Sequence, residues 1–512
     1  MKKSLAILFL VLLSANLFAQ NGTRLIGFDA KSMGRGGTSI GFFDGTELLM
    51  TNPAGISFLS SSKLNLDISG MMPKVHFKNS LNDKDGDNNF FPLPSAGFVN
   101  KYKKDSKFTW GAGVFTQGGM GADLNLKNEL YRTQTYGYNS SNGTYYPVKG
   151  DYQEQTYHSK FAVMQGGLSG AYAFNNNFSF GLSAHLVYSQ MEFGIPYSLS
   201  PSIMKGSAMP GMTFGQMFSA PPSMGGFGYN EVTATADMKE LNVITFGGKV
   251  GLAYKFNEMI SFGFTYSLPS KLTYKNGKAT MDMSKQFEDA MGRAVMGFYS
   301  QPGTGGIPLD TAFKYIGMNF ASMGIDLSKG MLANYDLEVG LKLPKSIGFG
   351  MSLKPSDNVK LGFDFEWVNW SNAFDKMSLT MTNGSNDNIN KMMGGSTVTI
   401  DFPLNWTDSY ILKVGGEYYP VNQFALRLGY VYGSNPVPET TVFSVFPAVV
   451  EHHFTFGAGY KINPNIMINA AFETALDRKL TGSNPHLVAS EYAGSTSELS
   501  TNLFHLSLDW NF

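Results

Sequence analysis

The sequence predicts an all-β fold, an antiparallel transmembrane β-barrel of about 14 strands. Three observations predict it. Long segments alternate between apolar and polar residues, short turns alternate with long connections, and no apolar run after residue 20 reaches the roughly 18 residues of a membrane-spanning helix. Only helices and closed barrels satisfy all their backbone polar groups in lipid, so a membrane chain without such a helix is expected to form a barrel.

The first residues predict export. Lys2 and Lys3 precede an apolar run from Leu5 to Leu13, and small and polar residues follow up to Ala19. This three-part pattern is typical of a signal peptide, and the apolar run is too short for a membrane anchor. We therefore assign residues 1–19 to a signal peptide, residues 20–62 to an N-terminal segment and residues 63–512 to the barrel.

The composition excludes several function classes. The chain has 512 residues, a net charge of +0 and no cysteine. A neutral chain lacks the basic face that nucleic acid requires, and a chain without cysteine has no disulfides, thiolate metal sites or thiol nucleophiles. We also find no nucleophile, zinc-protease or phosphate-loop motif, so no catalytic residue, metal or cofactor is expected.

Strand alternation gives one oily and one polar face. Phe178, Phe180, Leu182 and later alternate residues are apolar, whereas Ser179 and its alternates are small or polar. Successive side chains of a strand point to opposite faces, and outer-membrane barrels are apolar outside and polar within. The same pattern recurs in segments of about ten to fourteen residues around positions 244–256, 361–367, 426–430 and 454–460.

The connections differ between the two ends of the strands. Turns rich in Asn, Asp and Pro occur at 174–177, 256–259, 354–357, 420–423 and 462–465. Long connections lie between them, such as 192–242 and 271–335. Bacterial barrels have short periplasmic turns and long external loops, so the short side is assigned to the periplasm of a Gram-negative bacterium.

The last residues form an apolar strand that ends in an aromatic residue. Phe504, Leu506, Leu508, Trp510 and Phe512 occupy every second position. This arrangement resembles the signal that the outer-membrane barrel insertion machinery reads, so Phe512 is predicted to contact that machinery.

Residues 20–62 do not alternate and are rich in glycine, which predicts a plug, or hatch, inside the barrel. They contain a Gly-Arg element at Arg35, an acidic position at Asp44 and an Asn-Pro-Ala element at Asn52, Pro53 and Ala54. This segment resembles the hatch of the FadL-type outer-membrane transporters, which include long-chain fatty-acid and aromatic-hydrocarbon channels. The motif covers about thirty residues, and the layout of the family, a hatch within a fourteen-strand barrel, covers the whole mature chain.

The resemblance implies passive uptake of a hydrophobic small molecule. In that family external loops capture the ligand, the lumen receives it, and movement of the hatch releases it sideways through the wall at a kinked strand. Gly111 and Gly113 on the third strand, or Gly118, Gly119 and Gly121 after it, are candidate positions for the kink, although loop flexibility explains them equally well.

Two external segments are apolar and rich in methionine, which favours a ligand-collecting groove with short loop helices. The alternative is a small core beneath a long loop. The candidate groove residues are Met209, Met212, Phe214, Met217, Phe218, Phe287, Met291, Val295 and Phe298.

Alternation also directs a few charged residues into the lumen, notably Lys249, Glu366 and Arg427. Lys249 or Arg427 could meet a fatty-acid carboxylate by a charge-assisted contact, whereas mutual pairing within a polar lumen lining is the more common arrangement.

The predicted function is therefore passive transport of hydrophobic compounds by a monomeric barrel embedded in outer-membrane lipid. Two alternatives stay open: a related barrel that binds partner proteins in a secretion system, and a general porin.

Overall fold

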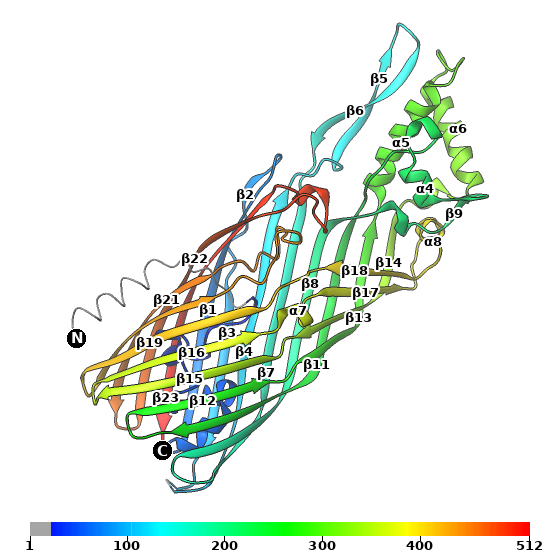
Figure 1. Cartoon of the computed structure of the whole chain (residues 1–512). Coiled ribbons are helices and arrows are strands. Elements are labelled where there is room, and N and C mark those ends of the chain that lie inside the picture. Colours follow the sequence, from blue (N-terminus) through cyan, green and yellow to red (C-terminus); the bar gives the residue numbers. More distant parts are fainter. Residues whose placement is uncertain (1–21, 104) are drawn as a thin grey trace.

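The computed structural model describes residues 22–103 and 105–512, and the expected signal peptide at 1–19 lies outside them (Figure 1). The chain forms one antiparallel sheet that closes on itself. Closure is made by β23 (Thr496–Asn511), which pairs with β1 (Lys63–Lys78) along the full length of both strands. Within the described residues, no helix is long and apolar enough to cross a membrane.

The prediction of a barrel of about fourteen strands is confirmed. Four of the fourteen are each interrupted once, so that β12 and β13, β14 and β15, β16 and β17, and β18 and β19 lie end to end. The remaining wall strands are β3 (Phe91–Asn100), β4 (Phe108–Leu126), β7 (Gln155–Ala173), β8 (Phe178–Leu199), β11 (Val232–Lys255), β12 (Ile260–Ser267), β13 (Ser270–Asp282), β14 (Leu332–Leu343), β15 (Ser346–Ser356), β16 (Val359–Val368), β17 (Lys376–Thr382), β18 (Val398–Pro403), β19 (Ser409–Val421), β20 (Phe424–Gly433), β21 (His452–Asn463) and β22 (Ile466–Thr481).

The two faces of the wall follow the alternation in the sequence. Phe246 points outward and is 79% exposed, whereas the neighbouring inward positions on β8, Ser183 and His185, are buried. Leu182 and Leu186 on β8 are also exposed. An exposed apolar band around the barrel is the surface that contacts lipid.

Apart from α7, which lies part-way along the wall between β16 and β17, the long connections carry the remaining elements at the end of the barrel away from the short turns (Figure 1). The hairpin of β5 and β6 projects beyond the rim, and α5 and α6 form the largest helical part. The elements are β2 (Asp83–Asp85), β5 (Arg132–Asn139), β6 (Thr144–Tyr152), β9 (Ser207–Met209), β10 (Met212–Thr213), α4 (Phe214–Ser219), α5 (Ser284–Tyr299), α6 (Leu309–Ser322), α7 (Trp370–Ala373), α8 (Asp387–Met393) and the 3-10 turns η2 (Pro201–Ile203), η3 (Pro222–Met224), η4 (Leu327–Lys329) and η5 (Ser490–Tyr492).

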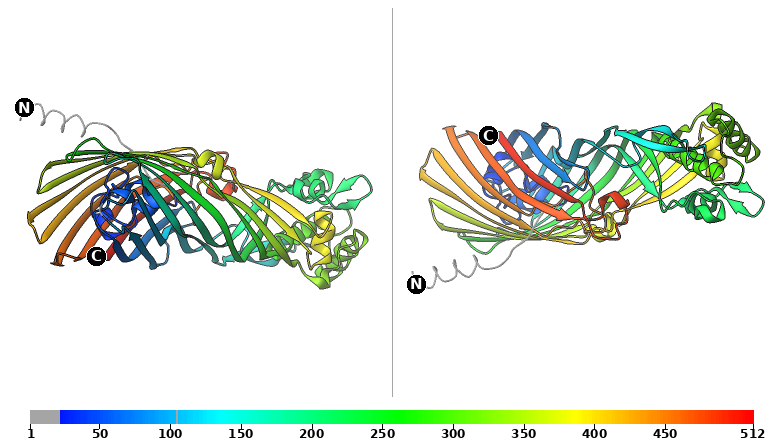
Figure 2. Two further views of the ribbon diagram at one scale, coloured as in Figure 1. Left: turned by 90° about the horizontal axis from the view of Figure 1, so that it is seen from below. Right: turned by 90° about the horizontal axis from the view of Figure 1, so that it is seen from above.

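The N-terminal segment lies inside the barrel, as the blue ribbon in Figure 2 shows. It consists of α2 (Ala30–Gly34), α3 (Leu48–Thr51) and the 3-10 turn η1 (Pro53–Phe58). Helix α2 packs against β20 to β23, and η1 packs against β4, β7, β8 and β11. Residues 22–62 therefore lie inside the barrel in contact with opposite sides of the wall, and we refer to them as the hatch.

Candidate functional site

A buried ion-pair network holds the hatch together around Arg35. Its guanidinium donates two hydrogen bonds to Asp44, at 2.9 and 3.1 Å, and lies 3.5 Å from Glu47. It also stacks over Phe42, with 4.0 Å between the guanidinium carbon and the ring centroid. Arg35 is completely buried, so these contacts replace water around its charge.

The Asn-Pro-Ala element joins the hatch to the barrel wall. The Asn52 amide donates to the carbonyl oxygen of Ile40 in the hatch and to that of Leu252 on β11, both at 3.0 Å. Its side-chain oxygen accepts a hydrogen bond from Ala54 N, and Pro53 occupies the first position of η1, where a missing N–H costs nothing. One asparagine therefore fixes the hatch to itself and to the wall.

Inward-facing glycines let the hatch lie directly on the strands. A Cβ on Gly251 would lie 2.2 Å from the Asn52 side-chain oxygen, and one on Gly181 would lie 2.3 Å from Ala54 N. Elsewhere, a Cβ on Gly415 would lie 1.9 Å from the Arg35 carbonyl oxygen. Any side chain at these positions would push the hatch inward, so the hatch and the wall are fitted to each other.

An apolar cavity of about 50 Å³, which we call the rim cavity, lies at the external rim on the inner face of the wall. It is lined from β8, β11, β13, β17 and β18, and its lining includes five methionines: Met238, Met281, Met283, Met381 and Met393. Methionine side chains are flexible and polarizable, so they can move aside to admit an apolar molecule larger than the resting cavity.

An aromatic cluster runs from Phe402 in the lining of the rim cavity toward the start of the hatch. Trp370 of α7 contacts Phe374 and Trp406, with ring centroids 4.9 and 5.2 Å apart. Phe161 and Phe446 extend the cluster. A Cβ on Gly22 would lie 2.6 Å from Trp370, so the cluster rests on the start of the hatch.

The wall is incomplete between β3 and β4. These strands pair from Asn100↔Trp110 to Ser95↔Phe115, and the described pairing ends there, although β3 continues outward to Phe91. Pro92 and Pro94 lie in this part of β3, which pairs with β1 but not with β4, and they have no N–H to donate.

Opposite this gap, β4 has a register shift between Thr116 and Gly118. The hatch covers the irregularity from inside, because Leu25 N donates to the Gln117 oxygen and Gly119 N donates to the Thr23 oxygen, both at 3.0 Å. A Cβ on Gly118 would lie 2.0 Å from that Thr23 oxygen. Gly118, Gly119 and Gly121 are expected from the sequence to follow the third strand, but β4 continues to Leu126 and contains them. Of the candidate glycines, Gly118 is the one at the irregularity.

Comparison with known proteins gives the family. A family model described as "Outer membrane protein transport protein (OMPP1/FadL/TodX)" matches residues 15–512. The chain belongs to the FadL/TodX family. The long-chain fatty acid transport protein of Escherichia coli is 21% identical over 425 residues, which are 82% of this chain and 73% of that protein.

Solved structures of FadL/TodX proteins share the fold. The toluene transporter TodX of Pseudomonas putida aligns with a TM-score of 0.64 at 16% identity, covering 96% of this chain and all of that one. A FadL homologue of Pseudomonas aeruginosa aligns equally well, with a TM-score of 0.64 at 16% identity and coverage of 96% of this chain. The protein is therefore an outer-membrane transporter of hydrophobic compounds in a Gram-negative bacterium, and the expectation that it is no enzyme is confirmed.

The motif residues of this FadL/TodX protein lie at two places in the hatch, Arg35 in the ion-pair network and Asn52 against β11. The candidate groove residues are mostly packed against one another. Phe214, Met217, Phe218, Phe287 and Val295 are buried in the core beneath the loops. Met212, Met291 and Phe298 are partly buried against that core, and Met209 is exposed. The rim cavity is lined by other residues, and sequence periodicity did not predict this set because most of its members come from five separate strands.

The three lumen charges have different surroundings. Glu366 pairs with Lys413 at 2.7 Å and with Arg24 of the hatch at 3.3 Å. Arg427 is buried and pairs with Glu417 at 2.6 Å. Lys249 forms no ion pair within the described residues and lines a small chamber, together with Arg24 of the hatch and Gln117 at the β4 irregularity. Of the three, Lys249 is the cation best placed for a ligand carboxylate.

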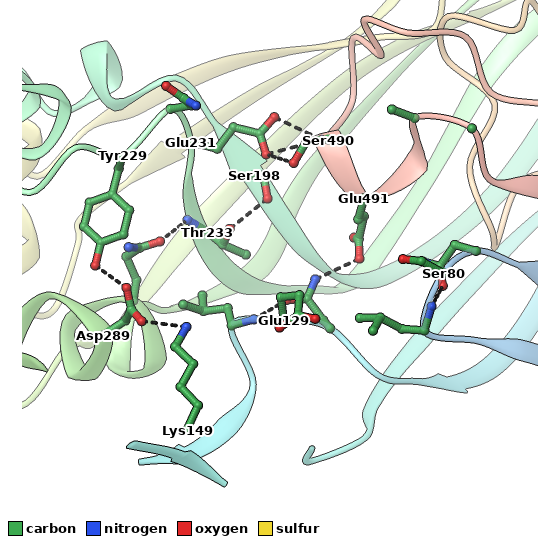
Figure 3. Close-up of a pocket in the computed structure, with 18 of the residues that line it drawn as sticks. Ser80, Glu129, Lys149, Ser198, Tyr229, Glu231, Thr233, Asp289, Ser490 and Glu491 are labelled. Carbon is green, nitrogen blue, oxygen red and sulfur yellow. Dashed lines mark hydrogen bonds and ion pairs between the residues drawn. The ribbon is translucent and has the colours of Figure 1, made fainter. Parts of the chain in front are cut away.

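A polar chamber of about 870 Å³ lies among the external loops (Figure 3). Glu491 accepts hydrogen bonds from Asn128 at 2.8 Å and from Tyr157 at 3.1 Å, and Glu231 accepts one from the Ser490 hydroxyl at 2.7 Å. Burial raises the pKa of Glu491 to about 7. These contacts join three loops across the mouth of the barrel.

We expect these loops to open more readily as the pH rises. A carboxyl whose pKa is raised in the folded state destabilises that state as the pH climbs from its ordinary pKa of about 4.5 to about 7, with no further change at higher pH. Hydrogen exchange of residues 486–495 should therefore be faster at pH 8 than at pH 5.5, after correction for the intrinsic pH dependence of exchange. The Glu491→Gln variant should lose this difference, and an unchanged difference in that variant would contradict the assignment.

Proposed function

We propose that this protein carries long-chain fatty acids or aromatic hydrocarbons passively across the outer membrane and releases them sideways into it. The observation that carries the proposal is the gap in the pairing of β3 with β4, behind which the hatch is hydrogen-bonded to the irregular part of β4. The rim cavity supports capture, because its lining is almost wholly apolar. The names of the fatty-acid and toluene relatives support the ligand class.

The route runs from the rim to the gap. A ligand enters the rim cavity, passes the aromatic cluster when those rings rotate, and reaches the chamber that contains Lys249. There Lys249 would bind a carboxylate, while an aromatic hydrocarbon would make only apolar contacts. Movement of Thr23–Leu25 away from β4 would then expose the gap. No energy source or cofactor is required, because the ligand moves down its own gradient.

A charge in the rim cavity should block capture. We expect Met381→Asp to lower uptake of oleate by roughly tenfold or more, because a buried carboxylate disfavours an apolar ligand by well over 1.4 kcal/mol. The measurement is the initial rate of uptake of radiolabelled oleate and toluene by cells that express each variant.

The double variant Met212→Asp, Met291→Asp is the matched comparison, since it places charges in the candidate loop groove instead. A fall in uptake there as well would support the groove as a first capture site. Normal uptake by Met381→Asp, with normal surface expression, would contradict the role of the rim cavity.

A second candidate function is partner binding in secretion. The β5–β6 hairpin favours it, because the hairpin projects from the rim and its Tyr138 and Tyr146 are exposed. A stoichiometric partner that is lost on deletion of residues 132–152, in cells with normal uptake, would support this function. The general porin is disfavoured, because the hatch occupies the lumen.

Two further expectations stay predictions. Phe512 is exposed beyond the end of β23, where the insertion machinery could reach it. The barrel closes within one chain, which is compatible with a monomer.

A further inference from the structure

A charged cavity of about 480 Å³ opens on the outer face of the wall. It lies between β13, β14 and β17, beside α7, where the four interrupted strands change course. Its lining includes Lys271, Lys342, Lys376, Glu338 and Ser371. None of these residues belongs to the rim cavity, the hatch or the lumen, so the transport route leaves this site without a role.

The cavity lies directly beyond the apolar band on the external side. The exposed residues Phe264 on β12 and Leu268 just after it are apolar, and Lys271 follows on β13. On the adjacent strand Phe349 and Ile347 are exposed, and Lys342 follows. Because the band marks the hydrocarbon core, the first charged residues beyond it lie at the level of the outer-leaflet headgroups.

Two lysines lie side by side in the lining of this cavity. Lys271 and Lys342 are direct partners in the β13–β14 ladder, and neither forms an ion pair within the described residues. Like charges directly opposite each other destabilise a sheet. The same ladder contains an opposite-charge pair, because Lys278 faces Asp336 and binds it at 2.7 Å.

The acidic residues nearby leave the two lysines uncompensated. Lys376 is the third lysine of the cavity, and it binds Asp401 at 2.6 Å. Glu338 lies four residues along β14 from Lys342, at the far end of the cavity, and Asp375 lies at its edge next to α7. An anion placed between Lys271 and Lys342 would remove their repulsion.

We propose that this cavity binds the phosphate-bearing sugar headgroup of an acidic outer-leaflet glycolipid. The two ammonium groups bind the phosphate, and Ser371 and Thr273 can donate to it or to a sugar oxygen. Glu338 and Asp375 can accept from sugar hydroxyls. The acyl chains then lie along the apolar band below, in contact with Leu268 and Ile347. This inference is independent of the transported ligand, since the site faces outward.

The test uses the full-length protein purified in detergent, with native mass spectrometry as the measurement. The probes are diphosphorylated lipid A, the same lipid with its phosphates removed, and inorganic phosphate as a competitor. The variants are Lys271→Gln, Lys342→Gln and, as a control of equal charge change on β1 and β22 at the opposite wall, Lys74→Gln, Lys479→Gln. Heat-modifiable migration in gels confirms that each variant folds.

We expect the wild type and the control to retain diphosphorylated lipid A, and the Lys271→Gln, Lys342→Gln variant to bind it roughly tenfold or more weakly. The dephosphorylated lipid should bind the wild type as weakly as the phosphorylated lipid binds that variant. Equal binding by all variants, or no preference for the phosphorylated lipid, would overturn the proposal. So would inorganic phosphate binding as tightly as the lipid, because the site would then select a free anion.

Discussion

Arg35→Ala is expected to convert a closed barrel into a leaky one. The substitution leaves Asp44 and Glu47 in the hatch without their buried guanidinium, which costs about 3–5 kcal/mol when a buried charge loses its partner. Lys31, 2.9 Å from Asp44, offsets part of this cost. The fourteen-strand wall does not depend on these contacts, so we expect the hatch to loosen while the barrel stays folded.

Single-channel conductance and liposome swelling with small sugars would measure the leak. The wild type should be nearly closed, and Arg35→Ala should admit sugars. Arg293→Ala is a suitable control, because that arginine pairs with Asp289 in the external helices and not with the hatch. A closed Arg35→Ala barrel of normal thermal stability would show that the network is not what holds the hatch.

Locking the hatch to the wall is expected to abolish uptake. The chain has no cysteine, so a single engineered disulfide is unambiguous. A Cβ on Gly97 of β3 would lie 2.8 Å from the Thr46 Cβ in the hatch, about 1 Å less than the usual separation in a disulfide. A small shift of the hatch would let Thr46→Cys, Gly97→Cys close this bond.

If hatch movement opens the route, the oxidised double variant should transport almost no oleate, and reduction should restore transport. The two single variants control for the substitutions themselves. Rapid uptake by the fully oxidised protein would contradict lateral release through movement of this part of the hatch.

The class of fold could be predicted from local patterns, because a lipid-facing strand must alternate and a turn needs Asn, Asp or Pro. The external ends of the strands could not be predicted in this way. The segment from Glu192 to Asn242 is expected to be a loop, yet β8 continues to Leu199 and β11 begins at Val232. Beyond the membrane neither face contacts lipid, so the alternation that marks a strand fades while the hydrogen-bonded ladder continues.

The site was predictable only where it is local in sequence. Asn52, Pro53 and Ala54 are consecutive, and their element is visible in the chain. The rim cavity brings together side chains such as Phe193 and Met393, whose proximity depends on the closure of the barrel. The role of the inward glycines was not predicted. In the sequence Gly181, Gly251 and Gly415 are small residues within strands, and only the structure shows that the hatch packs against them.

These glycines have a consequence for the exchange of parts between related proteins. Each one lies against a particular atom of the hatch, so the inner surface of the wall is shaped to fit one hatch. In a chimera that receives only the hatch of a related protein, the foreign hatch and these wall positions would not fit each other. A functional chimera would need the hatch and the matching wall positions from the same protein.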